Sequence, residues 1–480
     1  ETEDVIYDSR KAAPGKVFVA MKGIRVDGHS FIPQVLKAGV RVLVTERPVE
    51  EELKNSGLSE DELKQVTVVM VEEGRHALAL LSAARFDHPA KKLVMIGVTG
   101  TKGKTTTTHM IRAILLAAGK KVGMIGTTGT VIGYVVTPTL NTTPESYELH
   151  QAFAQMVEAG CEYAVMEVSS QGIKMHRTDG LYFNYAIFTN ISPDHIGPGE
   201  HADFEEYLYY KTRLLNMCGI GLVNKDDEHA PQIIKAANCE LYTYSEESKE
   251  ADFVASDIRY VSQPDFVGTE FHISGKYDME VRLGIPGLFN VVNALAAVSV
   301  CSFLGLDQAR ISHALENIRV NGRMEIVYTS ERCTVLVDYA HNAVSMESLL
   351  STLRDYKPKR LVCVFGCGGN RSKDRRYSMG EIGGKMADLS IITADNSRYE
   401  KVEDIIADIR GSIEKTGGKF IEIPDRREAI RYSILHAQPG DMVAVIGKGH
   451  EDYQEINGVR HHFLDREVIE ETVKELGEKA

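Results

Sequence analysis

The sequence predicts an α/β protein of three domains: a small N-terminal α/β domain, a central domain built on a mostly parallel sheet, and a Rossmann-like C-terminal domain. The chain has 480 residues, which is too long for one hydrophobic core and suits two to four domains. Short apolar segments alternate with helix-length segments in two separate series, a pattern typical of parallel sheets covered by helices. We place the three domains at residues 1–90, 91–320 and 321–480.

The first predicted domain contains two strand-like segments, KVFVAMKG and GVRVLVTE, with the short helical segment FIPQVLKAG between them. An acidic helical stretch, EEELKNSGLSEDELKQ, and a third apolar strand, VTVVMV, follow. The tract FDHPAKK at residues 86–92 is predicted to be a linker, because Pro89 ends the helix before it.

The central series begins with the strand LVMIGV, a glycine-rich loop and the helix TTTTHMIRAILLAAG, for which Gly119 is the expected stop. KVGMIG, YAVMEV, YAIFTN and GIGLVN are further strand candidates, separated by helix-length segments. Right-handed crossovers between parallel strands bring ligands to the carboxyl ends of the strands. We therefore expect the functional residues of this domain at those ends.

Two helical segments, residues 290–305 and 307–318, precede the second series. Strands are predicted there at TVLVDYA, LVCVFG, LSIITAD, KFIEI and MVAVIG, with helices such as KVEDIIADIRGSIEK between them. The motif G-x-G-x-x-G does not follow the first of these strands, so dinucleotide binding is not expected in this Rossmann-like domain.

Composition and charge exclude several classes of function. The net charge of −13 argues against a nucleic-acid partner, which would need clustered Lys and Arg. No apolar run approaches the roughly 18 residues of a membrane span, so membrane insertion is not expected. The seven cysteines are odd in number and scattered, which argues against a disulfide framework and indicates a cytoplasmic protein. The start, ETEDVIYDSRKAAPG, has neither a signal-peptide core nor an initiator Met, which indicates processing or truncation.

The segment GVTGTKGKTTTTHM, residues 97–110, is similar to a phosphate-binding loop. The pattern G-x-x-x-x-G-K-[ST] would need glycine where Val98 stands. A strand that feeds a glycine-rich turn into a helix start surrounds an anion with backbone N–H groups. Lys104 is then expected to reach the terminal phosphates, and the Thr105 hydroxyl to face Mg²⁺. The alternative, a plain glycine turn, is less favoured because four successive threonines open a helix poorly.

Three side chains follow apolar strands at the expected sheet edge: Glu167 in YAVMEV, and Asp194 and His195 in NISPDHIGPG. A carboxylate at the end of an apolar strand is unfavourable without a partner. Each residue alone has a simpler explanation, since strands often end in a surface acid and a single His is more often structural. Together the three favour a metal site beside the phosphate loop.

Eight motifs occur in order along nearly the whole chain. They are TGTKGKTTT, NTTPE, MEVSSQG, TNISPDH, GLFNVVNALAA, NGRME, DYAH and GKGHE. Together they resemble the Mur ligases, the ATP-dependent amide synthetases of peptidoglycan assembly, whose phosphate loop has the form Thr-Gly-Thr-x-Gly-Lys-Thr. The resemblance is strongest to the branch that adds a diamino acid to UDP-N-acetylmuramoyl-L-Ala-D-Glu.

The resemblance implies a two-step reaction. A substrate carboxylate attacks the γ-phosphate of ATP to give an acyl phosphate and ADP. The amine of the incoming amino acid then displaces phosphate through a tetrahedral intermediate. Two Mg²⁺ ions and Lys104 would offset the charge that develops on the transferred phosphoryl group. The implied partners are therefore small molecules, and the implied protein is a monomer.

For ATP and metal, the resemblance implies two groups of residues. The ATP-binding positions are Gly100, Thr101, Lys102, Gly103, Lys104, Thr105, Thr106, Asn290, Asn293, Arg323 and Asp338. The metal positions are Thr105 and Glu167 for one Mg²⁺, and His195 with a carbamate on Lys211 for the second. Lys104, Lys211 and His195 are the implied catalytic residues. Without the resemblance, Lys211 is a solvated helix lysine and Asn290 is a helix cap.

The resemblance also implies the positions that bind the other two substrates. UDP-sugar positions are Ser9, Arg10, Thr142, Thr143, Ser169 and Arg177. Amino-acid positions are Arg371, Asp395, Asn396, Arg398, Gly447 and Glu451, of which the last would receive an ammonium group. His341, in the DYAH motif, is assigned no separate role. Taken alone, the two threonines before Pro144 are more typical of a turn.

The amino-acid pocket is where the sequence departs from the family. Members that add meso-diaminopimelate carry Asp-Asn-Pro-Arg, whereas this chain has Ser397 in place of the proline, so the loop is expected to be less restricted in φ. The retained Arg398 favours an amino acid with a second carboxylate. We therefore expect meso-diaminopimelate ahead of L-lysine, whose side chain ends in an ammonium group.

Two alternatives remain open. One is a related amide ligase with a different acceptor, such as a Mur-type paralogue or a folylpolyglutamate or cyanophycin synthetase; NTTPE and YDSRK argue against the folate type. The other is a non-catalytic ATP-binding descendant. The intact set of catalytic and metal positions argues against this second alternative, since a scaffold need not retain them.

Overall fold

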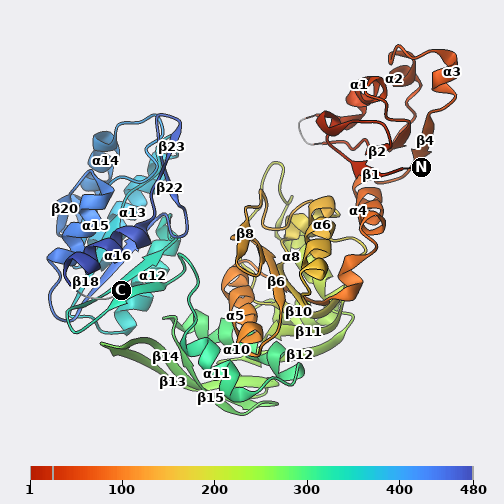
Figure 1. The fold of residues 1–480 in the computed structure, drawn as a ribbon. Coiled ribbons are helices and arrows are strands. Elements are labelled where there is room, and N and C mark those ends of the chain that lie inside the picture. Colours follow the sequence, from red (N-terminus) through yellow and green to blue (C-terminus); the bar gives the residue numbers. More distant parts are fainter. Residues whose placement is uncertain (1, 24–25, 478–480) are drawn as a thin grey trace. The chain divides into compact units, whose positions relative to one another are not determined.

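The computed structural model describes residues 2–23 and 26–477 (Figure 1). It contains two compact units, one of Glu1–Asp252 with Ala296–Leu306 and one of Phe253–Leu295 with Asp307–Ala480. Both units combine helices with parallel sheets, so the predicted α/β class is confirmed. The division into three domains stays a prediction. Within the part of the chain described, no helix is both long enough and apolar enough to cross a bilayer.

The first unit begins with a parallel sheet of four strands in the order β1-β2-β3-β4. The strands are β1 Asp4–Ile6, β2 Lys16–Val19, β3 Val42–Thr45 and β4 Thr67–Met70. Short helices accompany them: η1 Ser9–Lys11, η2 Gly28–Phe31, α1 Ile32–Lys37, α2 Glu50–Lys54 and α3 Glu60–Leu63. The predicted acidic helical stretch is thus two helices, because Gly57 turns left-handed and Ser59 begins a new helix with a capping box to Glu62.

Helix α4 (Gly74–Arg85) follows the small sheet and lies against α6 (Ser146–Glu158). It ends before the predicted linker, where Asp87 and His88 adopt left-handed backbone conformations ahead of η3 (Pro89–Lys92). The predicted helix end before Pro89 is confirmed, and the role of residues 86–92 as a linker between domains stays a prediction.

The larger sheet of the first unit has the strand order β12-β11-β10-β5-β9-β6-β7-β8. The strands are β5 Val94–Thr99, β6 Val122–Gly126, β7 Gly129–Ile132, β8 Val135–Thr137, β9 Tyr163–Glu167, β10 Phe183–Phe188, β11 Cys218–Asn224 and β12 Glu240–Ser245. Strand β7 pairs antiparallel with both β6 and β8. The other neighbouring pairs are parallel, as predicted. The remaining helices are α5 Lys104–Ala117, α7 Ser170–Lys174, α8 Phe204–Thr212, η4 Arg213–Asn216 and α9 Ala230–Ala236.

The second unit contains an antiparallel meander that the sequence did not predict. Its strands are β13 Phe253–Gln263, β14 Phe266–Gly275 and β15 Met279–Leu283, each paired with the next. Helix α10 (Leu288–Phe303) and helix α11 (Gln308–Glu316) follow the meander along the chain. Much of β13 is exposed, which weakens the apolar signal on which the prediction depended.

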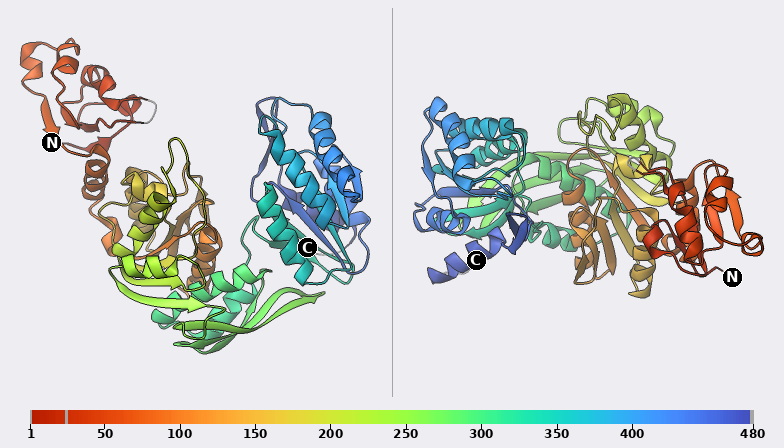
Figure 2. Two further views of the ribbon diagram at one scale, coloured as in Figure 1. Left: turned by 180° about the vertical axis from the view of Figure 1, so that it is seen from behind. Right: turned by 90° about the horizontal axis from the view of Figure 1, so that it is seen from above.

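The second unit also contains a six-stranded sheet in the order β16-β17-β21-β18-β19-β20, parallel except for β16. Its strands are β16 Glu325–Thr329, β17 Cys333–Asp338, β18 Arg360–Phe365, β19 Leu389–Ile392, β20 Phe420–Glu422 and β21 Asp441–Ile446. Helices cover both faces of this sheet (Figure 2). They are α12 Ala343–Asp355, α13 Lys373–Met386, α14 Val402–Thr416, α15 Arg426–Leu435 and α16 Asp465–Glu475, with a hairpin of β22 Tyr453–Ile456 and β23 Val459–His462.

Candidate active site

The glycine-rich loop joins the carboxyl end of β5 to the start of α5. Gly100 has φ 143° and Gly103 has φ 87°, conformations that favour glycine. A Cβ atom on Gly100 would lie 1.9 Å from Thr189 Oγ1, so a side chain does not fit there. Val98 belongs to β5 and is fully buried. The unusual spacing therefore has a physical reason, since the chain turns at Gly100 and not at position 98.

Two lysines meet at the loop. The Nζ atom of Lys104 donates to the carbonyl oxygens of Gly100 at 2.7 Å and Thr101 at 3.1 Å. Lys211 Nζ, from α8, donates to the same Gly100 oxygen at 2.7 Å. Lys211 is only 2% exposed, so the alternative of a solvated helix lysine is wrong. Burial, and then the nearby charge of Lys104, lower the pKa of Lys211 well below its usual range.

Glu167 lies at the end of β9, next to the loop. Its side chain is buried, and the Thr105 hydroxyl donates to both carboxylate oxygens at 3.0 Å. The Thr127 backbone N–H donates to the same carboxylate at 2.9 Å. The simpler explanation, a surface acid, is therefore wrong. Carboxylate and hydroxyl oxygens are ligands that Mg²⁺ prefers, so Thr105 and Glu167 fit the predicted ion.

The contacts of His195 are with acids other than Glu167. Its side chain is half exposed, and Nδ1 lies 3.1 Å from Glu200 Oε1, while Nε2 lies 3.8 Å from Asp194 Oδ2. The residue has φ 53°, a left-handed conformation that is uncommon for a non-glycine residue. Of the strand-end groups, the structure thus joins Glu167 to the loop and places His195 beside two other acids.

Three of the predicted UDP-sugar positions form one hydrogen-bonded cluster. Thr143 is fully buried, and its hydroxyl donates to the Glu167 carbonyl at 3.0 Å and accepts from the Ser169 N–H at 2.9 Å. The guanidinium of Arg177 donates to the Thr143 carbonyl at 3.0 Å. The Oγ1 atom of Thr142 lies 3.1 Å from that of Thr127. The cluster is therefore continuous with the phosphate loop through Glu167.

Ser9 and Arg10 lie on η1 of the small N-terminal sheet. The Arg10 side chain is 86% exposed and pairs with Asp8 at 2.8 Å. The hydrogen bond from Arg10 holds the pKa of the Asp8 carboxyl below its usual value. Arg10 is thus a solvent-facing cation held by its own 3-10 turn.

The remaining predicted ATP positions all belong to the second unit. Asn290 lies inside α10, where its side-chain amide donates to the Pro286 carbonyl at 2.7 Å, so the interpretation as a helix cap is wrong. Asn293 donates to Asn290 Oδ1 at 3.2 Å, which places the two on one helical face. Asp338 accepts the Met324 N–H at 2.8 Å. Burial raises the pKa of Asp338.

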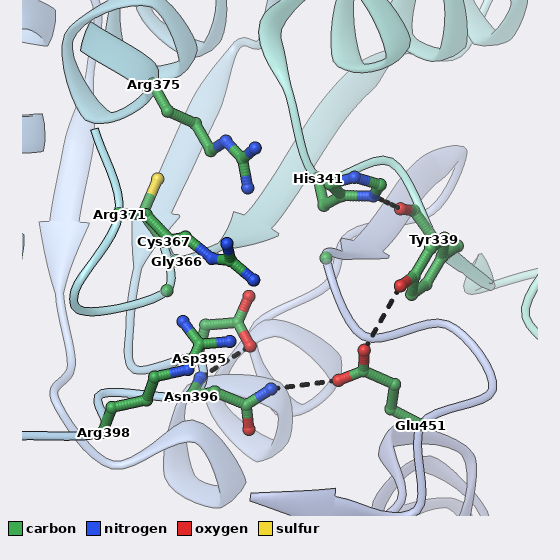
Figure 3. Close-up of a pocket in the computed structure, with 12 residues that line it drawn as sticks. Tyr339, His341, Gly366, Cys367, Arg371, Arg375, Asp395, Asn396, Arg398 and Glu451 are labelled. Carbon is green, nitrogen blue, oxygen red and sulfur yellow. Dashed lines mark hydrogen bonds between the residues drawn. The ribbon is translucent and has the colours of Figure 1, made fainter. Parts of the chain in front are cut away.

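A cavity of about 240 Å³ opens at the carboxyl ends of the six-stranded sheet in the second unit (Figure 3). All six predicted amino-acid positions line it: Arg371, Asp395, Asn396, Arg398, Gly447 and Glu451. The sheet topology explains the convergence, because β18, β19 and β21 are parallel neighbours and their carboxyl ends lie at one edge.

The acidic side chain of Glu451 lies on one wall of the cavity. The amide of Asn396 donates to Glu451 Oε2 at 3.0 Å, and the Tyr339 hydroxyl donates to Glu451 Oε1 at 3.3 Å. The Lys448 amine is fully buried and donates to Asn396 Oδ1 at 3.2 Å. Each carboxylate oxygen of Glu451 therefore accepts a hydrogen bond from a neighbouring side chain.

Arg398 forms another wall. It has φ 52°, and its guanidinium donates to the Gly369 carbonyl at 2.6 Å. Ser397 is buried at 3% exposure, its carbonyl accepts the Glu400 N–H at 3.0 Å, and a Cβ atom on Gly369 would lie 1.9 Å from that carbonyl. Close packing and hydrogen bonds therefore restrict this loop even though it lacks the proline. The expectation that it is less restricted in φ stays a prediction.

The sequence did not single out three residues that line or support the cavity. Arg375 points into it beside Arg371 (Figure 3), Tyr339 contacts Glu451, and Lys448 supports Asn396. Tyr339 and Lys448 stand inside two motifs already noted, DYAH and GKGHE, and Arg375 follows Arg371 in the basic segment GGNRSKDRR; these were the available signals. Several basic residues in one segment could not be ranked without knowing which of them face the cavity.

The fold and these sites define a class: an α/β protein with a glycine-rich strand–loop–helix segment in one unit and a charged cavity in the other. Family models agree with this class along the chain. The Mur ligase family catalytic domain matches residues 2–86, the Mur ligase middle domain residues 98–301, and the Mur ligase glutamate ligase domain residues 322–449. The chain belongs to the Mur ligase family.

Relatives that match nearly the whole chain include 2,6-diaminopimelate ligases. A UDP-N-acetylmuramoyl-L-alanyl-D-glutamate–2,6-diaminopimelate ligase of Caldanaerobacter subterraneus subsp. tengcongensis is 39% identical, over 98% of this chain and 94% of the relative. The ligase of the same name from Clostridium perfringens is 38% identical over the same shares. A solved structure of a ligase with that name is 30% identical, with a TM-score of 0.75, and the match covers 100% of this chain and 96% of that one.

Proposed function

We propose that the protein is an ATP-dependent ligase that adds meso-diaminopimelate to UDP-N-acetylmuramoyl-L-Ala-D-Glu. The observation that carries this proposal is the charged cavity of the second unit, which gathers all six expected amino-acid positions. Full-length similarity to 2,6-diaminopimelate ligases supports it. We propose residues 1–90 for the UDP-sugar, 91–320 for ATP and 321–480 for the amino acid.

The charges of the cavity favour an amino acid with two carboxylates. Three guanidinium groups, those of Arg371, Arg375 and Arg398, line it together with two acidic side chains, Asp395 and Glu451. Planar guanidinium groups bind carboxylates through paired hydrogen bonds. The acidic wall at Glu451 suits an ammonium group. L-lysine would leave an arginine facing a second ammonium, so we place meso-diaminopimelate ahead of L-lysine.

In the first unit, the loop binds the phosphates of ATP, with backbone N–H groups at the start of α5 and the Lys104 amine facing the anion. Thr105 and Glu167 would hold Mg²⁺, which supplies Lewis acidity at the phosphoryl oxygens when bound. Asn290, Asn293, Arg323 and Asp338, in the second unit, are proposed as nucleotide-binding positions from the family resemblance. Lys104 thereby offsets charge on the phosphoryl group while the substrate carboxylate attacks.

Lys211 is proposed as the carbamate site. A lysine reacts with CO₂ only as the neutral amine: the nitrogen lone pair forms the N–C bond, and one proton leaves to water. The depressed pKa of Lys211 provides that neutral form. The resulting anion, with His195, would hold the second Mg²⁺.

The UDP-sugar contacts are proposed from the cluster that joins the loop. Thr142, Thr143 and Ser169 offer hydroxyl groups, and Arg177 offers a cation, which together suit the diphosphate and muramoyl portion. Ser9 and Arg10 are proposed for the uridine end.

The test is phosphate release with UDP-N-acetylmuramoyl-L-Ala-D-Glu, ATP and Mg²⁺, comparing meso-diaminopimelate, L-lysine, L-ornithine and no amino acid. Release that depends on meso-diaminopimelate is the expected result. Dependence on L-lysine would keep the ligase and overturn the interpretation of the cavity. Release that no amino acid increases would overturn the proposal in favour of a ligase with another acceptor or a non-catalytic descendant.

A further inference from the structure

A cluster of two histidines and one aspartate lies in the first unit, apart from the proposed ligands of the loop. His76 belongs to α4, and His176 and Asp179 belong to the turn after α7. The Nδ1 atoms of His76 and His176 lie 2.6 Å and 2.7 Å from the same oxygen, Asp179 Oδ2. Each residue offers a metal-ligand atom within 4.8 Å of the other two.

The cluster is charged and open to solvent on one side. The side chains of His176 and Asp179 are 38% and 20% exposed. The His76 side chain is 50% exposed, so an ion from solvent can reach the cluster.

The backbone of the turn has an uncommon conformation at His176. His176 has φ 55°, a left-handed conformation that non-glycine residues seldom adopt. Its ring lies at a steep angle to that of His76, with 6.2 Å between the centroids. The two imidazoles thus approach Asp179 from different directions, as ligands of one ion do.

We propose that His76, His176 and Asp179 bind one divalent transition-metal ion of the Zn²⁺ type, with water as the fourth ligand. Two imidazoles and one carboxylate are a common ligand set for Zn²⁺ sites that keep an open position. Binding needs each nitrogen–oxygen separation to open to about 3.3 Å, the spacing of two tetrahedral ligands at about 2.0 Å from the ion. Neutral imidazoles can shift the proton to Nε2, so that Nδ1 binds the metal. Mg²⁺ does not compete strongly, because it prefers oxygen ligands.

The ion would reinforce a connection that already exists. Arg75 and Arg177, the sequence neighbours of two of the ligands, both pair with Glu145, at 3.2 Å and 2.8 Å. The two clusters therefore join α4 to the same turn. Metal binding is expected to slow the local opening of α4 against this part of the unit.

The test measures Zn²⁺ binding to the EDTA-treated full-length protein by equilibrium dialysis in excess Mg²⁺. The variants are His76→Gln, His176→Gln and Asp179→Asn, and the matched control is His313→Gln, an exposed histidine on α11. The expected result is one Zn²⁺ equivalent that weakens at least tenfold in each variant and is unchanged in the control. Equal stoichiometry and affinity in the wild type and all three variants would overturn the proposal.

Hydrogen exchange of α4 provides a second measurement that also controls for misfolding. Zn²⁺ should slow exchange in residues 74–85 of the wild type and of His313→Gln, and leave it unchanged in His76→Gln. A metal-free exchange pattern shared by all the proteins would show that the variants fold alike. Zn²⁺-dependent protection that persists in His76→Gln would contradict the site.

Discussion

The phosphate loop of the first unit and the charged cavity of the second unit are built in different ways. The loop depends on backbone conformation, with glycines at positions where a Cβ atom has no room, and its ionisable partners Glu167 and Lys211 are buried. The cavity depends on charged side chains placed at the ends of parallel strands. A site made of backbone has few alternatives in sequence, whereas a site made of side chains can change its ligand through single substitutions. We therefore expect specificity for the amino acid to reside in the cavity.

Lys211→Ala is expected to have the largest effect, a loss of ligation of about a thousandfold, since it removes the buried amine beside Gly100. Lys211→Arg should be as inactive, because a guanidinium stays protonated and cannot form a carbamate. The measurement is phosphate release with all three substrates, and Lys235→Ala, exposed on α9, is the control. Near-normal activity in Lys211→Arg would contradict the carbamate and would indicate that only the positive charge at residue 211 is needed.

Arg426→Met tests what supports the cavity. Arg426 is fully buried, pairs with Asp465 at 2.7 Å, and donates to the carbonyls of Ala394 and Ile446 at the ends of β19 and β21. Removing one partner leaves a buried charge and should lower the free energy of unfolding of the second unit by about 3 kcal/mol.

The measurement for Arg426→Met is a thermal unfolding scan, together with nucleotide binding to report on the loop and amino-acid binding to report on the cavity. The control is Arg427→Ala, which removes the neighbouring exposed pair with Glu471 and should change stability little. If Arg426→Met weakened nucleotide binding as much as amino-acid binding, the two sites would not be independent.

Gly100→Ala tests whether the backbone conformation of the loop is needed for activity. The new Cβ atom would meet Thr189 Oγ1 at 1.9 Å in a left-handed conformation, so the loop must shift. We expect ATP-dependent turnover to fall about a hundredfold, since misplaced catalytic geometry has costs of that order. Gly411→Ala, in α14 with open space around it, is the control and should be neutral or slightly stabilising. A fully active Gly100→Ala variant would mean that the loop is not constrained as described.

Arg398→Lys should have the smallest effect of the four, because it keeps the charge and loses only the forked geometry. We expect kcat/KM for meso-diaminopimelate to fall about tenfold while the KM for ATP stays constant. Arg410→Lys, on the surface of α14, is the matched control. An equal fall in kcat/KM for L-lysine would show that Arg398 does not bind the second carboxylate of the amino acid.

Much of the architecture follows from local pattern. Alternating apolar and helical segments predicted the parallel sheets of both units, and Gly119 ends α5 where the chain turns left-handed, as expected. The motifs also predicted six residues that the second unit brings to one cavity. The meander of β13–β15 and the split of the acidic stretch into α2 and α3 were missed, because exposed strands and very short helices carry weak periodicity.

The sequence by itself determined where the chain turns, which segments form strands and helices, and which family the motifs match, because these depend on neighbouring residues. Only the tertiary structure decided the burial of Lys211, the pairing of Thr105 with Glu167, and the meeting of His76 with Asp179. These contacts join residues 111, 62 and 103 positions apart, respectively. Burial and charge at such sites depend on how distant segments pack, so the pKa of Lys211 and the ligands of a metal are properties of the fold.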